Sequence, residues 1–519
     1  MKKIFFITLL FCNAFITPAQ TQYIQWQRSL GGSMDDAGVA VQSTTDGGYI
    51  VTGESRSNNG DVTVNHGDVD YWVVKLDSLG AIEWQKSLGG TLEDKAKAIQ
   101  QTTDGGYIVA GSSTSNNGDV TGNHGNMDGW VVKLNSTGTI QWQKTVGGTS
   151  DDNLESVWQT ADGGYVVAGD TRSNNGDVTG GPLGNNDCWV VKLDSLGVIQ
   201  WQNPLGGTMD DYAYAVQQTA DSGYIVAGGV YSNDSAVSGN HGFIDYWVFK
   251  LNSAGVLQWQ KTLGGVNWDY ASAIQQTTDG GYIVTGISDS NTGDVTGNHG
   301  GYDQWVAKLN STGTIQWERS LGGTGTESGQ SVYQTADGGY IVAGMSDSND
   351  NDVSGNHGGA DCWIVKLDST GTIQWQKPLG GTGNDSGLSI YPTTGSGYII
   401  AGSSASNDGD VSGNHGGYDY WVVKLDTAFV SVSLKENEIL RSITVFPNPS
   451  NGKINFSNLA AGEKENTIEI YDITGRSIYK TRSKNNDQTI DLSEKDKGVY
   501  FYKISNSNKI IQQGKIILQ

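Results

Sequence analysis

The chain has 519 residues, with 74 glycines, 7 prolines and 17% charged residues. Without a glycine at every third position it is not a collagen, and 16 tryptophans with 23 tyrosines argue against disorder. The net charge of −23 disfavours a nucleic-acid binder, because neutralising phosphates requires lysine and arginine. The length alone would suggest three to four domains, and glycine with aromatic residues is typical of short strands joined by tight turns.

The first residues are typical of a secretory signal peptide. Two lysines precede a mostly apolar run over residues 4–15, and a small-residue cleavage site ends at Ala19, before Gln20. We therefore expect a signal peptide over residues 1–19. A lipoprotein signal at Cys12 is disfavoured, because the residue before it is bulky. No later apolar run reaches the ~18 residues of a membrane-spanning helix, so no transmembrane segment is expected in the mature chain.

Tryptophan recurs in two series with a period of 58 or 59 residues. A fixed period of this size is typical of a solenoid, a propeller or an array. The two series are Trp26, Trp84, Trp142, Trp201, Trp259, Trp317 and Trp375, and Trp72, Trp130, Trp189, Trp247, Trp305, Trp363 and Trp421.

Each repeat contains four predicted strands, as residues 95–148 illustrate. Strands rich in β-branched and aromatic residues are separated by an Asp-Gly-Gly turn, a polar loop of about 16 residues and a Ser-Thr-Gly turn. No window shows helical periodicity. In this repeat the strands are expected at 96–102, 107–111, 129–135 and 139–146.

Four antiparallel strands repeated seven times predict a seven-bladed β-propeller over residues 20–426. The chain enters with a lone fourth strand over 23–30 and leaves the repeats after a third strand over 419–426. We therefore expect the N-terminal strand to complete the last blade and remove a bare edge. An open solenoid would need capping repeats, which the sequence lacks.

Two cysteines remain after removal of the signal. Cys188 and Cys362 each precede a tryptophan at the same phase, three repeats apart. Equivalent positions on separate repeats do not normally touch, so we expect free, packed thiols rather than a disulfide.

The composition changes after the repeats. The net charge is −28 over residues 20–426 and +4 over residues 440–519, with a polar linker expected over 427–439. The tail contains seven short alternating segments, typical of a small Ig-like β-sandwich. The expected fold class is therefore all-β, a seven-bladed β-propeller followed by that sandwich. The seven segments are 443–447, 453–457, 467–472, 477–481, 488–492, 499–505 and 509–517.

Two features of the repeats resemble known propellers. The hairpin from Lys75 to Trp84 is similar to the Trp-docking signature of pyrroloquinoline-quinone-type propellers, in which an Asp, a Gly and a later Trp tie neighbouring blades together. Its Asp-to-Gly spacing is one residue shorter, so the likeness supports the fold and not the cofactor. The Asp-Gly-Gly-Tyr-Ile-Val-Ala-Gly strand resembles repeats of secreted bacterial propellers that generally lack an assigned activity.

The tail carries three motifs in order. They are Val-Phe-Pro-Asn-Pro from Val445, Ile-Tyr-Asp from Ile470, and Lys-Gly-Val-Tyr from Lys497. Together they resemble the type A C-terminal sorting domain of the type IX secretion system. An ordinary carbohydrate-binding sandwich is the alternative. The residues that match the sorting motifs are Pro447, Asn448, Pro449, Gly452, Gly475, Arg476, Gly498, Tyr500 and Lys515.

The resemblance implies an export route. It implies a Bacteroidota-type bacterium, passage through the Sec translocon to the periplasm, and translocation across the outer membrane by the type IX machinery. Removal of the tail and either surface attachment or release would follow. The expected location is the cell surface or the extracellular space.

Histidine and aspartate recur in the long loops, which share one face of a propeller with the short loops between repeats. Carboxylates suit Ca²⁺ and imidazoles suit transition metals, so one interpretation is a metal-supported or glycan-binding face. The stronger interpretation is structural, because Asp before a strand accepts backbone N–H bonds and pins a loop. The candidate residues are His66, His124, His241, His299, His357 and His415, with Asp70, Asp128, Asp187, Asp245, Asp303, Asp361 and Asp419.

No cofactor is expected, and Ca²⁺ is the one candidate considered. The segment 347–352 partly mimics a calcium loop but lacks the Gly and the Glu that such loops require. Departures from the repeat point to rim aromatics that could stack on sugars or pack between blades. The aromatic departures are Tyr212, Tyr214 and Tyr231 and the off-phase Trp158 and Trp268. A further departure is residues 181–184, which replace one histidine segment.

We therefore expect an exported binding or adhesion module for glycan or protein. No nucleophile elbow, zinc-protease motif or phosphate loop is present, so no catalytic residue is assigned. The alternatives are a polysaccharide-active enzyme and a structural surface protein. Expected partners are the Sec translocon, the type IX machinery and an extracellular glycan or protein, with no nucleic acid.

Overall fold

The computed structural model describes residues 20–393, 397–429, 443–459, 465–506 and 509–519. The expected signal peptide lies outside these residues, as does most of the expected linker. The chain divides into two compact units, Met1–Phe429 and Val430–Gln519. No helix occurs among the described residues, which confirms the all-β class. Consequently no described segment is a helix that could span a membrane.

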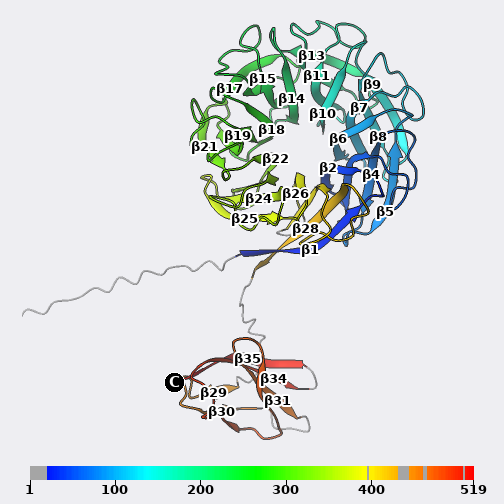
Figure 1. Ribbon diagram of the computed structural model, residues 1–519. Helices are drawn as coiled ribbons and strands as arrows, with labels where there is room; N and C mark the ends of the chain where they lie inside the picture. Colours follow the sequence, from blue (N-terminus) through cyan, green and yellow to red (C-terminus); the bar gives the residue numbers. More distant parts are fainter. Residues whose placement is uncertain (1–19, 394–396, 430–442, 460–464, 507–508) are drawn as a thin grey trace, which may run out of the picture. The chain divides into compact units, whose positions relative to one another are not determined.

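Seven four-stranded antiparallel sheets form the first unit and follow one another around a ring (Figure 1). Six sheets use four consecutive strands each. They are β2 (Asp36–Ser43), β3 (Tyr49–Ser55), β4 (Asp70–Leu76) and β5 (Ile82–Leu88); β6 (Asp94–Gln101), β7 (Tyr107–Ser113), β8 (Asp128–Leu134) and β9 (Ile140–Val146); β10 (Asp152–Gln159), β11 (Tyr165–Thr171), β12 (Asp187–Leu193) and β13 (Ile199–Leu205); β14 (Asp211–Gln218), β15 (Tyr224–Val230), β16 (Asp245–Leu251) and β17 (Leu257–Leu263); β18 (Asp269–Gln276), β19 (Tyr282–Ser288), β20 (Asp303–Leu309) and β21 (Ile315–Leu321); and β22 (Glu327–Gln334), β23 (Tyr340–Ser346), β24 (Asp361–Leu367) and β25 (Ile373–Leu379).

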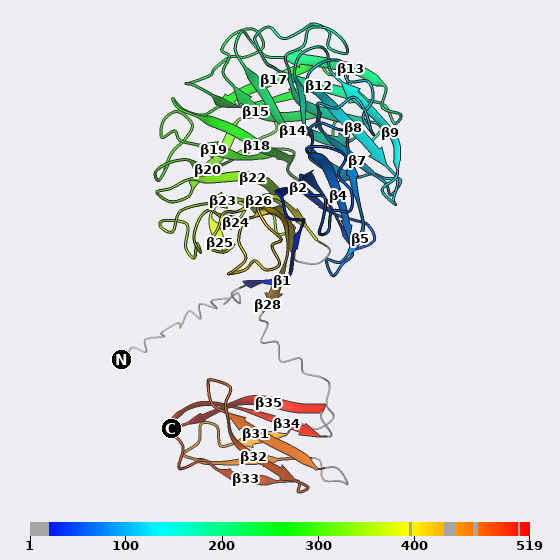
Figure 2. The ribbon, with the colours of Figure 1, turned by 45° about the vertical axis from the view of Figure 1, so that its right-hand side comes forward.

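The two ends of the ring meet in one sheet. It contains β26 (Asp385–Pro392), β27 (Tyr398–Ser404), β28 (Asp419–Phe429) and β1 (Gln20–Leu30). β1 pairs antiparallel with β28 from Gln20 opposite Phe429 to Leu30 opposite Tyr420. Figure 2 shows the two strands side by side where the ring closes. Because β1 supplies the outer strand, no edge of β28 is left unpaired.

The strands differ from the predicted segments mainly at their ends. β6 begins at Asp94, two residues earlier than expected, because the Asp94 amide donates to the Val69 carbonyl of the preceding long loop at 2.7 Å. β28 continues to Phe429, three residues into the expected linker, because β1 extends to Gln20 and pairs with it. Long-range pairing therefore sets these ends.

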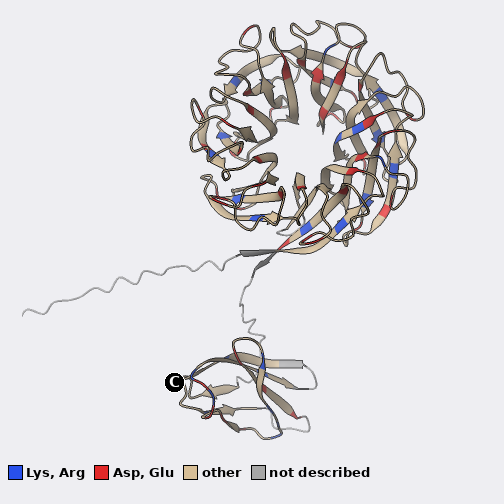
Figure 3. Cartoon of the chain, viewed as in Figure 1, with Lys and Arg blue, Asp and Glu red and all other residues tan. Residues whose placement is uncertain are grey.

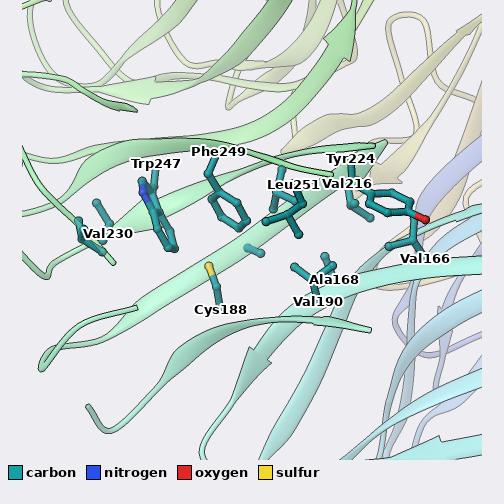
Figure 4. Close-up of a cluster of buried hydrophobic side chains, with 13 residues drawn as sticks. Val166, Ala168, Cys188, Val190, Val216, Tyr224, Val230, Trp247, Phe249 and Leu251 are labelled. Carbon is teal, nitrogen blue, oxygen red and sulfur yellow. The ribbon is translucent and has the colours of Figure 1, made fainter. Parts of the chain in front are cut away.

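The second tryptophan series forms the buried layer of the ring. Trp72 is fully buried, and its Nε1 donates to Gln85 Oε1 on the neighbouring strand at 2.8 Å. The equivalent Trp247 packs with Phe249 and the thiol of Cys188 in an apolar cluster between two sheets (Figure 4). Cys188 and Cys362 are both buried and free, which confirms the expectation of unpaired thiols.

Six tryptophans of the first series, all except Trp375, tie one sheet to the next. The Trp26 ring lies against Gly80 in the turn of the next sheet, and its Nε1 donates to the Ser78 carbonyl at 3.3 Å. Gly80 has φ +78°, and a Cβ there would lie 2.9 Å from the ring, so only glycine fits both the turn and the contact. This contact is the docking arrangement that the hairpin motif predicts.

A buried lysine recurs in the third strand of every sheet, and the blue segments in Figure 3 mark basic residues around the ring. Lys75 donates to the Leu76 carbonyl at 3.0 Å and pairs with Asp46 in the adjacent turn at 3.0 Å. Burial acts to raise the pKa of Asp46, but hydrogen bonds from Thr44, the Gly48 amide and Lys75 outweigh it and lower that pKa to about 2. The lysine is thus paired although its side chain is only 2% exposed.

The second unit consists of two sheets around a shared apolar core. Ile454 and Phe456 of one sheet and Ile468 and Ile504 of the other belong to the same buried cluster. The first sheet contains β29 (Thr444–Phe446), β30 (Lys453–Ser457) and β33 (Gln488–Asp491), and the second contains β32 (Ser477–Ser483), β31 (Asn466–Tyr471), β34 (Gly498–Asn506) and β35 (Lys509–Leu518).

Candidate functional site

The long loops and the short loops between sheets lie on one side of the ring, which we call the loop face. The long loop 56–69 contacts two short loops. The Asp61 amide donates to the Gly31 carbonyl of one short loop at 2.8 Å, and Val69 forms an isolated parallel β-bridge with Glu93 of the other. All the histidines and aspartates predicted as site residues lie on this face, at the ends of the long loops. The structure therefore places the predicted residues in one zone but spreads them around the ring.

Each histidine is bound by the aspartate four residues later. His66 donates its backbone N–H to Asp70 Oδ2 at 2.8 Å, and its ring Nδ1 lies 2.7 Å from the same oxygen. The pair recurs in His124–Asp128, His241–Asp245, His299–Asp303, His357–Asp361 and His415–Asp419, with Nδ1–Oδ2 distances of 2.6 to 2.8 Å. Since the acceptor is a carboxylate, Nδ1 carries the proton and Nε2 is left as the free ring nitrogen. These hydrogen bonds hold the end of the long loop in place.

One sheet shows what the histidine adds to the turn. Residues 181–184 replace the histidine segment, and the Leu183 amide donates to Asp187 Oδ2 at 3.0 Å. The backbone hydrogen bond to the aspartate is thus kept without an imidazole. The structural role of the aspartate does not depend on the histidine, and the ligand-binding interpretation of these residues stays a prediction.

A second buried carboxylate stands beside each of these aspartates, at the start of the next inner strand. Asp94 accepts hydrogen bonds from the Gly90 amide at 2.7 Å and from Ser115 at 2.9 Å. Asp70 is also fully buried, and its Oδ1 has no hydrogen-bond partner among the described residues. Burial raises the pKa of both carboxyls, and the charge of Asp70 adds to the rise at Asp94. The same unpartnered Oδ1 recurs in all seven sheets, at Asp70, Asp128, Asp187, Asp245, Asp303, Asp361 and Asp419.

The segment that mimics a calcium loop uses its carboxylates otherwise. Asp347 Oδ1 accepts the Thr326 amide at 2.6 Å, and Asp350 Oδ1 accepts the Thr324 amide at 2.9 Å. Among the described residues no group of three or more His, Cys, Asp or Glu side chains is arranged to hold a metal ion. These carboxylates therefore fasten neighbouring loops.

Grooves on the outer flank of the ring each hold one of the histidines. One groove of about 480 Å³ is lined by His299, Arg319 and Asp352. Two others, of about 490 and 520 Å³, lie at equivalent places around His241 and His415, and each also contains one basic residue and one aspartate. Arg319 is engaged in the fold, since it donates to the Glu318 and Thr370 carbonyls at 2.6 and 3.0 Å.

The central channel is lined by side chains of the inner strands, which are small and aliphatic residues together with glutamines, Trp158, Tyr333 and Tyr391. Its volume is about 200 Å³. Trp158 lines it at the position where other sheets have Gln42 or Gln100, whose side-chain oxygens accept the backbone N–H of the next inner strand. The off-phase Trp158 therefore belongs to the lining of the channel.

An acid cluster on the inner strands departs from the repeat. Glu155 and Tyr214 are the extra residues of β-bulges in β10 and β14, and Lys97 holds that place in β6. Lys97 Nζ lies 4.0 Å from Glu155 Oε2. Asp170 at the end of β11 is 7% exposed; burial raises its pKa to about 7, hydrogen bonding with Asn186 opposes the shift, and the charge of Glu155 adds to it. No other sheet has two carboxyls at these two positions.

An aromatic trio lies on the loop face, at the junction between the β14–β17 sheet and the β18–β21 sheet. It consists of Tyr231, Phe243 and Trp268, with ring centroids 6.0 Å apart for Tyr231–Trp268 and 6.3 Å apart for Phe243–Trp268. Phe243 is 63% and Trp268 40% exposed. Tyr212 and Tyr270 lie nearby and both contact Tyr214, with centroids 6.1 and 6.2 Å apart.

At another junction of the ring, the positions of the aromatic trio are held by Arg56, Asp68 and Glu93. Arg56 Nη1 lies 3.0 Å from Asp68 Oδ1, and its Nη2 lies 3.5 Å from Glu93 Oε1. The backbone is equivalent: Arg56 and Tyr231 both donate to an aspartate carbonyl at 3.1 Å, and Glu93 and Trp268 form the same isolated bridge. The fold accepts an ion-pair network at these positions, so it does not require exposed aromatics there.

Only part of this region is predicted from the sequence. Tyr212, Tyr214, Tyr231 and Trp268 stood out as departures from the repeat, whereas Phe243 and the pair Glu155 and Asp170 were missed. Aligning the seven repeats position by position would have exposed them, because Phe243 and Glu155 are each the only residue of their type at their place, and only one repeat combines carboxyls at the places of Glu155 and Asp170.

The sorting motifs meet at one edge of the second unit. Asn448 of the first motif donates through Nδ2 to the Lys515 carbonyl at 2.6 Å and accepts the Ile517 amide at 2.9 Å. Arg476 pairs with Asp472 at 3.0 Å within the middle motif, and the Tyr500 hydroxyl donates to the Asp496 carbonyl at 2.7 Å. The first and last motifs are therefore joined by Asn448.

Residues 444–519 match the family described as secretion system C-terminal sorting domain. This part of the chain is a type IX secretion sorting domain. The sorting domain directs the chain through the type IX system to the cell surface or the extracellular space, which confirms the predicted location. It also implies the type IX machinery as a partner.

Outside the sorting domain the comparisons are more distant. The regulatory protein FlaEY of Caulobacter vibrioides is 22% identical over 386 residues, which cover 65% of this chain and 40% of that protein. Less than half of that curated relative is therefore spanned.

Two solved structures are similar to this chain at low identity. PorZ, a surface component of the type IX secretion system of Porphyromonas gingivalis, is 13% identical with a TM-score of 0.41, covering 91% of this chain and 58% of that one. The WD40 domain of Neurospora crassa Pan2 is 11% identical with a TM-score of 0.42, covering 77% and 94%.

Proposed function

We propose that this chain is an exported binding module: a seven-bladed β-propeller that holds an extracellular ligand at the cell surface, delivered by an Ig-like sorting domain. The domain boundaries we propose are 20–426 for the propeller, 427–439 for the linker and 440–519 for the sorting domain, after a signal peptide over 1–19. The observation that carries the proposal is the aromatic trio, which exposes large rings where an equivalent junction has an ion-pair network. Exposed apolar clusters of this kind mark interaction sites.

Substituting the trio tests the binding function. We expect Tyr231→Ala, Phe243→Ala and Trp268→Ala together to abolish retention of the labelled, exported chain on intact cells and their extracellular material. The matched control is Arg56→Ala, Asp68→Ala and Glu93→Ala, which alters the same three positions at another junction. Equal retention of both triple variants and the wild type would refute the proposal.

Removing the sorting domain tests the delivery. A chain truncated after Phe429 keeps every strand of the ring and is expected to accumulate in the periplasm, because the segment matching the sorting family is gone. Immunoblots of periplasm, cell surface and medium measure the distribution. The trio variant, with its sorting domain intact, serves as the exported control, and an unchanged distribution of the truncated chain would contradict the prediction.

An enzyme acting on polysaccharide is the second candidate. It is favoured by the acid cluster, because only one sheet has carboxyls at the positions of both Glu155 and Asp170. Burial raises the pKa of both groups, and that of Asp170 is about 7. A carboxyl that is protonated near neutral pH can act as a general acid. Release of reducing ends from a polysaccharide panel, lost in Asp170→Asn and in Glu155→Gln, would favour the enzyme over the binding module.

A further inference from the structure

We propose that the ligand is an uncharged polysaccharide, which stacks sugar rings on Tyr231, Phe243 and Trp268 and donates hydroxyl hydrogen bonds to the acid groups beside them. This inference rests on the proposed binding function and names the class of ligand for the same surface.

The trio is held in place before any ligand arrives. The Trp268 amide donates to Asp289 Oδ1 at 2.6 Å, and its carbonyl accepts the Asp289 amide at 3.1 Å. A parallel bridge to Ile244 fixes Trp268 from the other side. The Tyr231 ring stands at 88° to Trp268, whereas Phe243 lies within 22° of it. The backbone that carries Trp268 is therefore already ordered, so binding does not have to order this loop first.

Hydrogen-bond acceptors lie next to the rings. The Tyr231 amide donates to the Asp210 carbonyl at 3.1 Å, so Asp210 lies directly beside the trio. Asp210 Oδ1 is buried and has no partner among the described residues. The residue as a whole is only half-buried, so its carboxylate group reaches the surface, where it can accept a hydrogen bond from a ligand hydroxyl.

Sugars match this mixture better than a protein surface does. A sugar ring presents a C–H face that packs on an aromatic ring and hydroxyls that donate to carboxylates, so both kinds of group are satisfied at once. A protein partner that covered the trio with apolar side chains would desolvate the neighbouring carboxylates without pairing them, and charged residues are depleted at the cores of protein interfaces.

The charge of the ring limits the ligand further. Residues 20–426 carry a net charge of −28, and Asp210 and Asp289 are both hydrogen-bonded to the backbone of the trio. Polyanionic chains would be repelled by like charge. The surface therefore favours glycans without acidic groups.

Affinity electrophoresis of the full exported chain tests the inference directly. The gels contain laminarin, xylan, mannan or galactan, with alginate as an anionic probe. We expect retardation by at least one of the four neutral polysaccharides and none by alginate. The trio variant should lose roughly tenfold or more in affinity, because three ring contacts are removed, while the variant with Ala at positions 56, 68 and 93 should bind as the wild type does. Thermal melting of both variants confirms folding.

A parallel experiment separates failure of the inference from failure of the proposed function. Cell-surface material is treated with protease or with periodate, which cleaves sugar diols, before the chain is applied. If periodate abolishes retention and protease does not, the result supports a polysaccharide ligand. Loss after protease only, with the trio still required, overturns the inference and leaves the binding function standing. Polysaccharide binding that the trio variant retains overturns the inference as well, and no trio-dependent retention on any material refutes both.

Discussion

A chain that begins at Gly31, without β1, is expected to lose the cooperative fold of the ring. β1 pairs with β28 along its whole length, and Trp421 Nε1 donates to Gln27 Oε1 across the junction at 3.0 Å. Roughly ten lost hydrogen bonds at about 1 kcal/mol each, with the burial of Leu30, cost on the order of 10 kcal/mol. Since domains are typically stable by only about 5–15 kcal/mol, this loss is comparable to the whole stability.

The loss comes from both sides of β1. Arg28 Nε donates to the Gly80 carbonyl at 3.1 Å and Gln27 Nε2 to the Ser412 carbonyl at 3.1 Å, so β1 joins the last sheet to the first. Circular dichroism and calorimetry of chains starting at Gln20 and at Gly31 measure the effect. A synthetic peptide of residues 20–30 should restore part of the melting transition. A cooperative transition within a few degrees of the longer chain's would show that closure by β1 is dispensable.

The repeat pattern predicted the fold because the same contacts recur in every sheet. Trp72 and its equivalents mark the third strand, and Trp26 and its equivalents mark the fourth, so their spacing alone locates two strands of each sheet. The strand ends were less predictable, because β6 is lengthened by Val69 of another loop and β28 by the N-terminal segment. Such partners are distant in sequence, and no local pattern reports them.

The candidate site was harder to predict than the fold. A residue repeated in every sheet, such as His66 or Asp70, draws attention in a sequence, yet its contacts are local and hold a loop in place. The residues that set one region apart occur once each. Phe243 and Trp268 are separated by 25 positions, and only the packing of adjacent sheets brings their rings within 6.3 Å. Their juxtaposition depends on the geometry of the ring.

The ring is expected to be more stable at pH 5 than at pH 8. Burial raises the pKa of Asp170 to about 7, above the value of 3.8 for an unperturbed carboxyl. A group whose folded pKa is raised binds its proton more tightly when folded, so stability falls as pH rises from about 4 to about 7. For Asp170 alone this amounts to about 4 kcal/mol. Asp211 and Asp245, with pKa values of about 6, act in the same direction.

The variant Asp170→Asn isolates this contribution. It removes the charge, so we expect it to raise the melting temperature at pH 8 and to reduce the difference between pH 5 and pH 8. Comparison with the wild type cancels the titration of the six histidines, which both chains share. The matched control is Asp46→Asn: the pKa of Asp46 is about 2, so its stabilising charge is lost only as pH falls from about 4 to about 2. That control should lower the melting temperature equally at pH 5 and pH 8. An Asp170→Asn chain with the same pH dependence as the wild type would show that Asp170 is ionised without cost in the folded ring, and that the acid cluster is solvated more like the surface than its burial implies.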